Sequence, residues 1–146
     1  MNANPWLIVG GALSAAAAIL HVGVIIGGPA WYRFFGAGVS MARMAERGEL
    51  FPAIVTAGIA IVHAVWAAYA FAGAGLIRTL PLMRTALVAI SLIYLVRGLL
   101  IVPVLMSASP KTFDIWSSLI VLGYGIVYAI GTARAWPALS HKESFV

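Results

Sequence analysis

The chain has 146 residues, of which 63% are hydrophobic and only 9% are charged, and this excludes a soluble globular domain, which carries about 25% charged residues. Its lack of cysteine excludes disulfide exchange, thiolate catalysis and cysteine-bound zinc. The net charge of +5 comes from basic residues that stand singly at the ends of apolar runs, a pattern typical of membrane anchoring and not of a nucleic-acid-binding face.

Four apolar runs are each long enough for a helix that crosses a membrane, which takes about 20 residues. They cover about residues 6–28, 52–77, 85–106 and 115–135. Because the runs lack strict alternation and are rich in Ala, Leu, Ile and Val, they favour helices over strands. The predicted fold is therefore all-α, a four-helix transmembrane bundle forming a single integral membrane domain over 1–146. The first run is too long for a signal-peptide core, so we expect it to be retained as a span.

The connection between the first two spans is long for a helical hairpin and predicts a short amphipathic helix. Ser40 is a candidate N-cap for this helix, and Gly48 is a candidate stop. The helical period places two groups on different faces, Met41, Met44 and Ala45 on one and Arg43, Glu46 and Arg47 on the other. A solvated loop is the alternative.

The distribution of basic residues bears on the orientation of this multi-pass membrane protein. Arg78 and Arg84 flank the short turn after the second span, and basic residues in short connections favour the cytoplasmic side. This favours a topology with both termini inside. The three arginines of the first connection, which follow the first span, argue the other way.

Arg97 stands in the middle of the third apolar run, where an arginine costs about 2.5–3.5 kcal/mol on insertion scales. A rise of about 1.5 Å per residue places one polar residue of each span in a common layer. This layer lies nearer the side of the first connection and contains His21, His63, Arg97 and Tyr124. Tyr94 lies one turn before Arg97, and Glu49 borders the same side of the membrane.

Three kinds of partner could satisfy Arg97. The first is Glu46 or Glu49, folded in from the first connection. The second is the carbonyl of Leu99, which is freed because Pro103 has no N–H. The third is an anionic or carbonyl-bearing ligand. A pocket with a cation, imidazoles, tyrosine hydroxyls and apolar walls fits an anionic or quinone-like amphiphile.

The leading hypothesis is thus an intramembrane polar pocket for a membrane lipid or lipophilic small molecule. Its predicted ligand-binding residues are Arg97, His21, His63, Tyr94, Tyr124 and Glu49.

An alternative is an electron-transfer protein that binds haem through His21 and His63. No other metal is predicted, since no intramembrane carboxylate supplies a third ligand. A structural or accessory subunit, with Arg97 held by Glu49, is a further alternative, and a homo-oligomer is compatible with each reading. No catalytic residue can be named.

The stretches GGPAWYRFFGAG, MARMAERGELFP and IYLVRGL resemble a set of small bacterial integral membrane proteins of unassigned function. The likeness runs along most of the chain. It implies four spans and a multi-pass protein of the bacterial inner (plasma) membrane, and it supplies no activity.

The stretch ARMAERGELFPA resembles the start of the second helix in the membrane-associated eicosanoid and glutathione family, MAPEG. In that family an arginine, an asparagine and a glutamate precede a proline and bind glutathione. Arg43, Glu49 and Pro52 match in kind, whereas Glu46 stands where the family has its asparagine. Arg97 would match the arginine-bearing third helix. The resemblance implies a glutathione-using trimer with a thiol-conjugating site between subunits.

Overall fold

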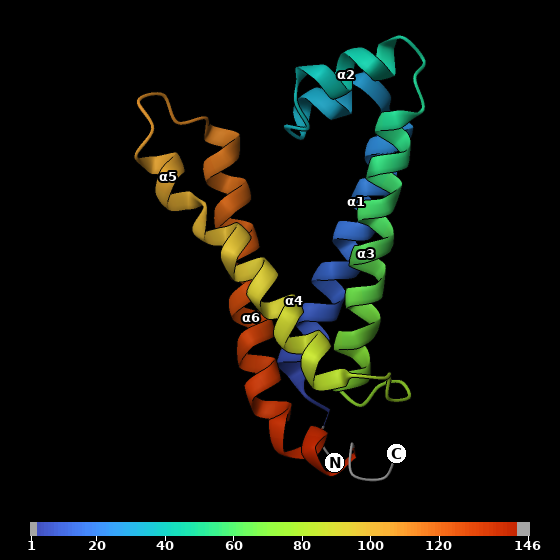
Figure 1. Cartoon of the computed structure of the whole chain (residues 1–146), viewed down its shortest axis with the longest axis vertical. Coiled ribbons are helices and arrows are strands. Elements are labelled where there is room, and N and C mark those ends of the chain that lie inside the picture. The colour runs from blue at the N-terminus through green and yellow to red at the C-terminus, as the bar shows by residue number, and fades with distance from the viewer. Residues whose placement is uncertain (1–2, 143–146) are drawn as a thin grey trace. The chain divides into compact units, whose positions relative to one another are not determined.

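The computed structural model describes residues 3–142 of the chain, with side chains through residue 139, and this part of the chain is helical (Figure 1). The helices are α1 (Pro5–Phe34), α2 (Val39–Glu46), α3 (Phe51–Gly73), α4 (Met83–Leu99), α5 (Ile101–Leu105) and α6 (Thr112–Lys142). Four segments are long and apolar enough to cross a membrane, namely α1, α3, Met83–Leu105 and Thr112–Leu139. The predicted all-α class, with four membrane-spanning helices and a short helix in the first connection, is confirmed. The protein is an integral, multi-pass membrane protein.

The chain forms two compact units, which are described separately. One unit contains the start of α1, the end of α3 and all of α4 to α6, over Met1–Leu13 and Trp66–Val146. We call it the α4–α6 unit. The other contains Ser14–Val65, with most of α1, all of α2 and most of α3, and we call it the α2 unit. The prediction of a single domain stays a prediction.

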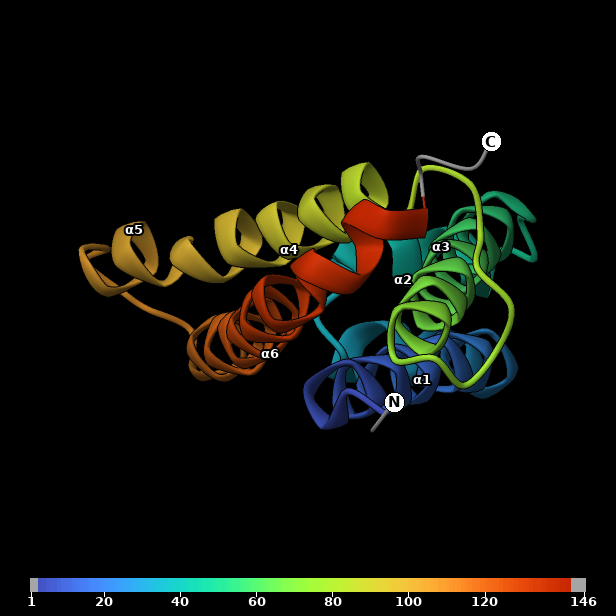
Figure 2. The same ribbon diagram turned by 90° about the horizontal axis from the view of Figure 1, so that it is seen from below.

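Two glycines bring α4 and α6 together in the α4–α6 unit. The two helices run side by side in both views (Figures 1 and 2). A Cβ on Gly98 of α4 would lie 2.5 Å from the α-carbon of Leu122, and one on Gly125 of α6 would lie 2.8 Å from the backbone nitrogen of Leu95. Small residues allow such close approach between membrane helices. The core of this unit gathers around Leu7, Leu87, Tyr94 and Tyr128.

Asn4 fixes the start of α1 to its neighbours in the same unit. Its Oδ1 accepts hydrogen bonds from the backbone N–H groups of Trp6 and Leu7, at 3.1 and 3.3 Å, which is the geometry of an N-cap. Its side-chain Nδ2 donates to the carbonyl of Gly131 on α6 at 2.8 Å, and its backbone N–H donates to Ala74 O at 3.3 Å. One residue therefore ties α1 to α6 and to the end of α3.

The α2 unit is organised by a sharp kink in α1. Gly28 has φ 64° and ψ −148°, a backbone region that is essentially open only to glycine, and Pro29 follows it. The first span was predicted to end at Gly28, and this is where the straight part of α1 ends. After the kink the chain turns back, and α2 packs over α1 in a cluster of Val24, Tyr32 and Ala42.

Both ends of α2 depend on glycine. The N-cap is Gly38, with φ 97°, and no side chain caps the helix, so the predicted cap at Ser40 is wrong. Ser40 lies inside the first turn because Gly38 already directs the chain into the helix. The predicted stop at Gly48 is confirmed. Gly48 has φ 72°, and the N–H groups of Gly48 and Glu49 donate to Ala45 O and Met44 O, which is a Schellman motif.

The predicted boundaries of the other three spans need correction. α3 ends at Gly73 and not at residue 77, because Gly75 takes φ 83° and ends the helix in a second Schellman motif. The third span starts at Met83 and is broken at Leu100, because Pro103 of α5 has no N–H to bond the Leu99 carbonyl four residues earlier. α6 runs over Thr112–Lys142, well beyond the predicted 115–135.

Candidate functional site

Arg97 lies near the end of α4, in the α4–α6 unit, and its side chain is exposed. Its position follows from the adjacent Gly98, which holds α4 against α6 and places Arg97 beside the first turns of α6. There its guanidinium donates to Ser117 Oγ at 3.0 Å and to Ser118 Oγ at 3.4 Å. Within residues 3–139, no carboxylate forms an ion pair with Arg97. Two neutral hydroxyls are thus the hydrogen-bond partners of a full positive charge.

An aromatic cluster lies next to Arg97 along the same pair of helices. Tyr94 is one turn before Arg97 on α4 and is 3% exposed. Its ring meets those of Trp66 and Tyr124 edge to face, at centroid distances of 4.9 and 5.4 Å. Tyr128 is fully buried and donates its hydroxyl proton to the Trp66 carbonyl at 3.2 Å. Two of the predicted site residues, Tyr94 and Tyr124, therefore touch each other within the unit that carries Arg97.

The two predicted histidines come together in the α2 unit. The rings of His21 on α1 and His63 on α3 are stacked, with centroids 5.1 Å apart and planes at 23°. Each Nδ1 contacts the carbonyl four residues earlier, Ala17 O at 2.7 Å and Ile59 O at 2.9 Å. Because a carbonyl only accepts, each Nδ1 carries a proton in these contacts.

This arrangement bears on the haem alternative. Axial haem ligands oppose each other across the iron, whereas the His21 and His63 rings are stacked on each other. The stacked pair does not itself form a bis-histidine haem site, and haem ligation stays a prediction. Among the residues that the structure describes, no three histidine or acidic side chains gather at a point that could hold a metal ion.

Glu49 pairs with a near neighbour in the first connection. Its Oε1 accepts from Arg47 Nε at 2.6 Å, and both side chains are substantially exposed. Glu46 forms the other ion pair of this unit, with Arg33 at the end of α1. The amphipathic prediction is confirmed, since Arg43, Glu46 and Arg47 are exposed while the opposite face packs on α1, with Ala42 as its buried centre.

The six predicted site residues thus lie at four separate places. Arg97 contacts Ser117 and Ser118, Tyr94 contacts Tyr124, His21 contacts His63, and Glu49 lies just after α2. The sequence predicts that polar residues of all four spans meet in one layer. These residues belong to both units, so this stays a prediction. The serine partners of Arg97 were missed. The signal was the Ser-Ser pair near the start of the fourth span, on the same side of the membrane as Arg97.

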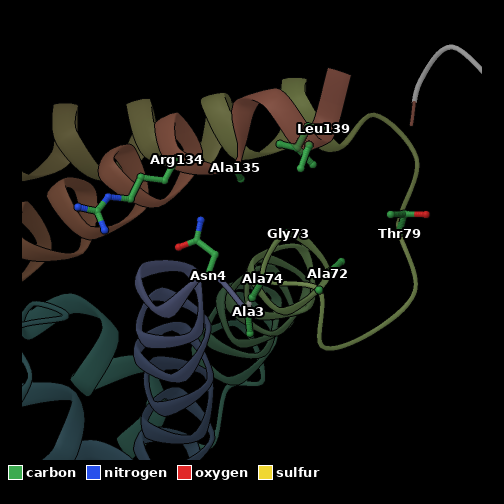
Figure 3. Close-up of a pocket in the computed structure, with 11 residues that line it drawn as sticks. Ala3, Asn4, Ala72, Gly73, Ala74, Thr79, Arg134, Ala135 and Leu139 are labelled. Atoms are coloured by element: carbon green, nitrogen blue, oxygen red, sulfur yellow. The ribbon is translucent and has the colours of Figure 1, made fainter. Parts of the chain in front are cut away.

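One cavity of 310 Å³ lies elsewhere in the α4–α6 unit, between the start of α1, the end of α3 and α6 (Figure 3). Most of its lining consists of alanine and glycine, including Ala72, Gly73 and Ala135. Arg134 is among the lining residues, but Figure 3 shows its side chain extending away from Gly73 and Leu139. The cavity therefore lacks a charged anchor directed into it.

Comparison of the chain with protein-family models, with curated proteins and with solved structures finds no match. The function has to be argued from the chemistry of the site.

Proposed function

We propose that the protein binds an anionic or quinone-like amphiphile in the bacterial inner membrane, with Arg97 as the anchor for the head group. The observation that carries this proposal is that, among the side chains of residues 3–139, Arg97 pairs only with the hydroxyls of Ser117 and Ser118. These hydroxyls orient the guanidinium without neutralising it. An arginine in an apolar segment is costly and is by default a candidate functional residue.

The donor geometry supports an oxygen ligand. A guanidinium has five N–H donors in a planar fork, and the two serines use one donor on each terminal nitrogen. The remaining donors suit a phosphate or carboxylate, which arginine binds through two parallel hydrogen bonds. A quinone carbonyl would accept one of them. The exposure of Arg97 allows such a head group to approach from the surrounding lipid.

The depth of Arg97 fits a membrane amphiphile. It lies eight residues before the end of α5, roughly 12 Å along the helix axis, which is within reach of head groups through a long side chain. The aromatic cluster of Tyr94 and Tyr124 continues from Arg97 toward the membrane centre. Tyr124, which is only partly buried, would contact the tail or ring of the bound molecule, whereas Tyr94 lies behind it in the core.

The first test is native mass spectrometry of the protein purified in dodecyl maltoside, with phosphatidylglycerol, phosphatidylcholine and ubiquinone added in turn. We expect selective retention of phosphatidylglycerol or of ubiquinone by the wild type. Arg97→Ala should weaken this binding about tenfold or more, because a charge-assisted hydrogen bond contributes roughly 1.5–3 kcal/mol. Arg97→Lys should retain part of it, because the charge remains.

Arg78→Ala is the matched control, since it removes the same charge from the connection between α3 and α4. It should leave binding unchanged. Equal binding by the wild type and Arg97→Ala would refute the proposal and favour a structural role for Arg97. Comparison of phosphatidylglycerol with ubiquinone separates the two ligand chemistries.

A further inference from the structure

A second feature of the α4–α6 unit is an apolar surface groove between α1 and α6. It has a volume of 350 Å³ and is lined by Pro5, Trp6, Val9 and Val127. Val9 is 48% exposed, so the groove opens outward from the helix pair. A hydrocarbon chain in this groove would contact α1 and α6 at the same time, whereas a chain lying on the surface of one helix would contact that helix alone.

Arg134 stands at one end of this groove. It follows Val127 by seven residues, which places both on the same face of α6, about 10 Å apart along the axis. The Arg134 guanidinium lies over the ring of Trp6, 5.6 Å from its centroid, in a cation–π contact. Arg134 is exposed, and no acidic side chain of residues 3–139 forms an ion pair with it.

The groove is held in shape by direct contacts between its two helices. Asn4 donates to the carbonyl of Gly131, which lies between Val127 and Arg134 on α6. A Cβ on Gly131 would lie 2.8 Å from the Leu7 side chain, so α1 and α6 touch at this point. A groove that is formed before binding loses less conformational entropy when a ligand enters.

We infer that this groove binds one anionic phospholipid, with the phosphate on Arg134 and one acyl chain between Pro5, Trp6, Val9 and Val127. Arginine suits a phosphate through its planar set of donors, and tryptophan suits the membrane interface because its ring is amphipathic. The site is independent of the one proposed at Arg97. Arg134 comes seventeen residues after Ser117 on α6, about 25 Å along the axis, so the two sites face opposite leaflets.

The test measures binding of dioleoyl phosphatidylglycerol and dioleoyl phosphatidylcholine to the full chain in dodecyl maltoside by native mass spectrometry. We expect Arg134→Gln to weaken phosphatidylglycerol binding at one site about tenfold, with Arg134→Lys weakened less. Val127→Trp should weaken the same site by filling the groove. Arg78→Gln and Val96→Trp are matched controls, and both should bind like the wild type, because Arg78 and Val96 lie outside the groove.

Three outcomes would overturn the inference that Arg134 and the groove bind an anionic phospholipid. If Val127→Trp binds normally while Arg134→Gln does not, the site holds a phosphate without its acyl chain. Displacement of the lipid by inorganic phosphate at equal concentration would lead to the same conclusion. Equal affinity for the two lipids would show that charge is not recognised. The Arg97 site is distinguished by its own variant, because Arg97→Ala and Arg134→Gln should each remove one bound lipid and the double variant should remove both.

Discussion

Gly98 is the residue at which α4 and α6 come closest, and it is adjacent to Arg97. Its missing side chain would meet the α-carbon and the backbone nitrogen of Leu122 at 2.5 and 2.6 Å. Backbone atoms cannot rotate out of the way, so any side chain here must push the helices apart. Arg97 would then move away from Ser117 and Ser118.

Gly98→Ala should therefore lower the free energy of unfolding by about 1–3 kcal/mol, the usual cost of overpacking. Thermal unfolding in dodecyl maltoside, followed by circular dichroism, measures this change. Gly123→Ala is the control, because a Cβ on Gly123 of α6 meets nothing within 4 Å. An unchanged melting temperature for Gly98→Ala would contradict the close approach of the two backbones.

At this scale, the sequence identified Arg97 because a single charge in an apolar run is conspicuous. It did not identify Ser117 and Ser118 as its partners, because the register of one helix against another depends on packing. Gly98 and Gly125 set that register, and their pairing with Leu122 and Leu95 cannot be derived from spacing along either helix.

At the scale of elements, the turn after α1 depends on the backbone of one glycine. Gly28 has φ 64° and ψ −148°, and an alanine in such a region is strained by about 1–3 kcal/mol. Gly28→Ala should loosen the packing of α2 on Val24 and Tyr32 and raise the rate of amide hydrogen exchange over Val39–Glu46. Mass spectrometry of deuterium uptake measures this rate.

Gly58→Ala serves as the control for that experiment. Gly58 lies in the regular part of α3, and a Cβ there meets nothing within 4 Å, so exchange in α2 should stay as in the wild type. If Gly28→Ala also leaves exchange in α2 unchanged, the kink does not hold α2 in place.

The existence of the elements could be predicted from the sequence, but several of their ends could not. The apolar runs predicted the four spans, but the third was expected to be unbroken over 85–106. Pro103 was noted only for the Leu99 carbonyl that it leaves without a partner, and the break at Leu100 was missed. The stop at Gly48 was also foreseen from its residue type. The end of α3 was missed because Leu76 and Ile77 continue the apolar pattern, whereas the left-handed conformation of Gly75 ends the helix.

At the scale of the whole molecule, four spans require the first and third connections to lie on one side of the membrane and the second on the other. The chain has no cysteine, so single replacements report the topology without background. We expect Ala37→Cys and Ser109→Cys to react with a membrane-impermeant maleimide in intact cells. Thr79→Cys should react only after permeabilisation, since Arg78 and Arg84 favour the cytoplasm.

Labelling of Ala37→Cys and Ser109→Cys from opposite sides would contradict the four-span topology. Labelling of Thr79→Cys alone in intact cells would reverse the orientation and leave the four spans in place. The wild-type chain, which has no cysteine, is the negative control for labelling.

The length of α6 links the protein to the thickness of its membrane. Its 31 residues extend about 46 Å, whereas the hydrocarbon layer is about 30 Å thick. The excess has to be accommodated by tilting or by a helix end that protrudes into the water. A thinner bilayer increases this hydrophobic mismatch. α6 supplies Ser117 near one end and Arg134 toward the other. A change in acyl-chain length that tilts α6 would therefore change the depth of both lipid sites in the membrane together.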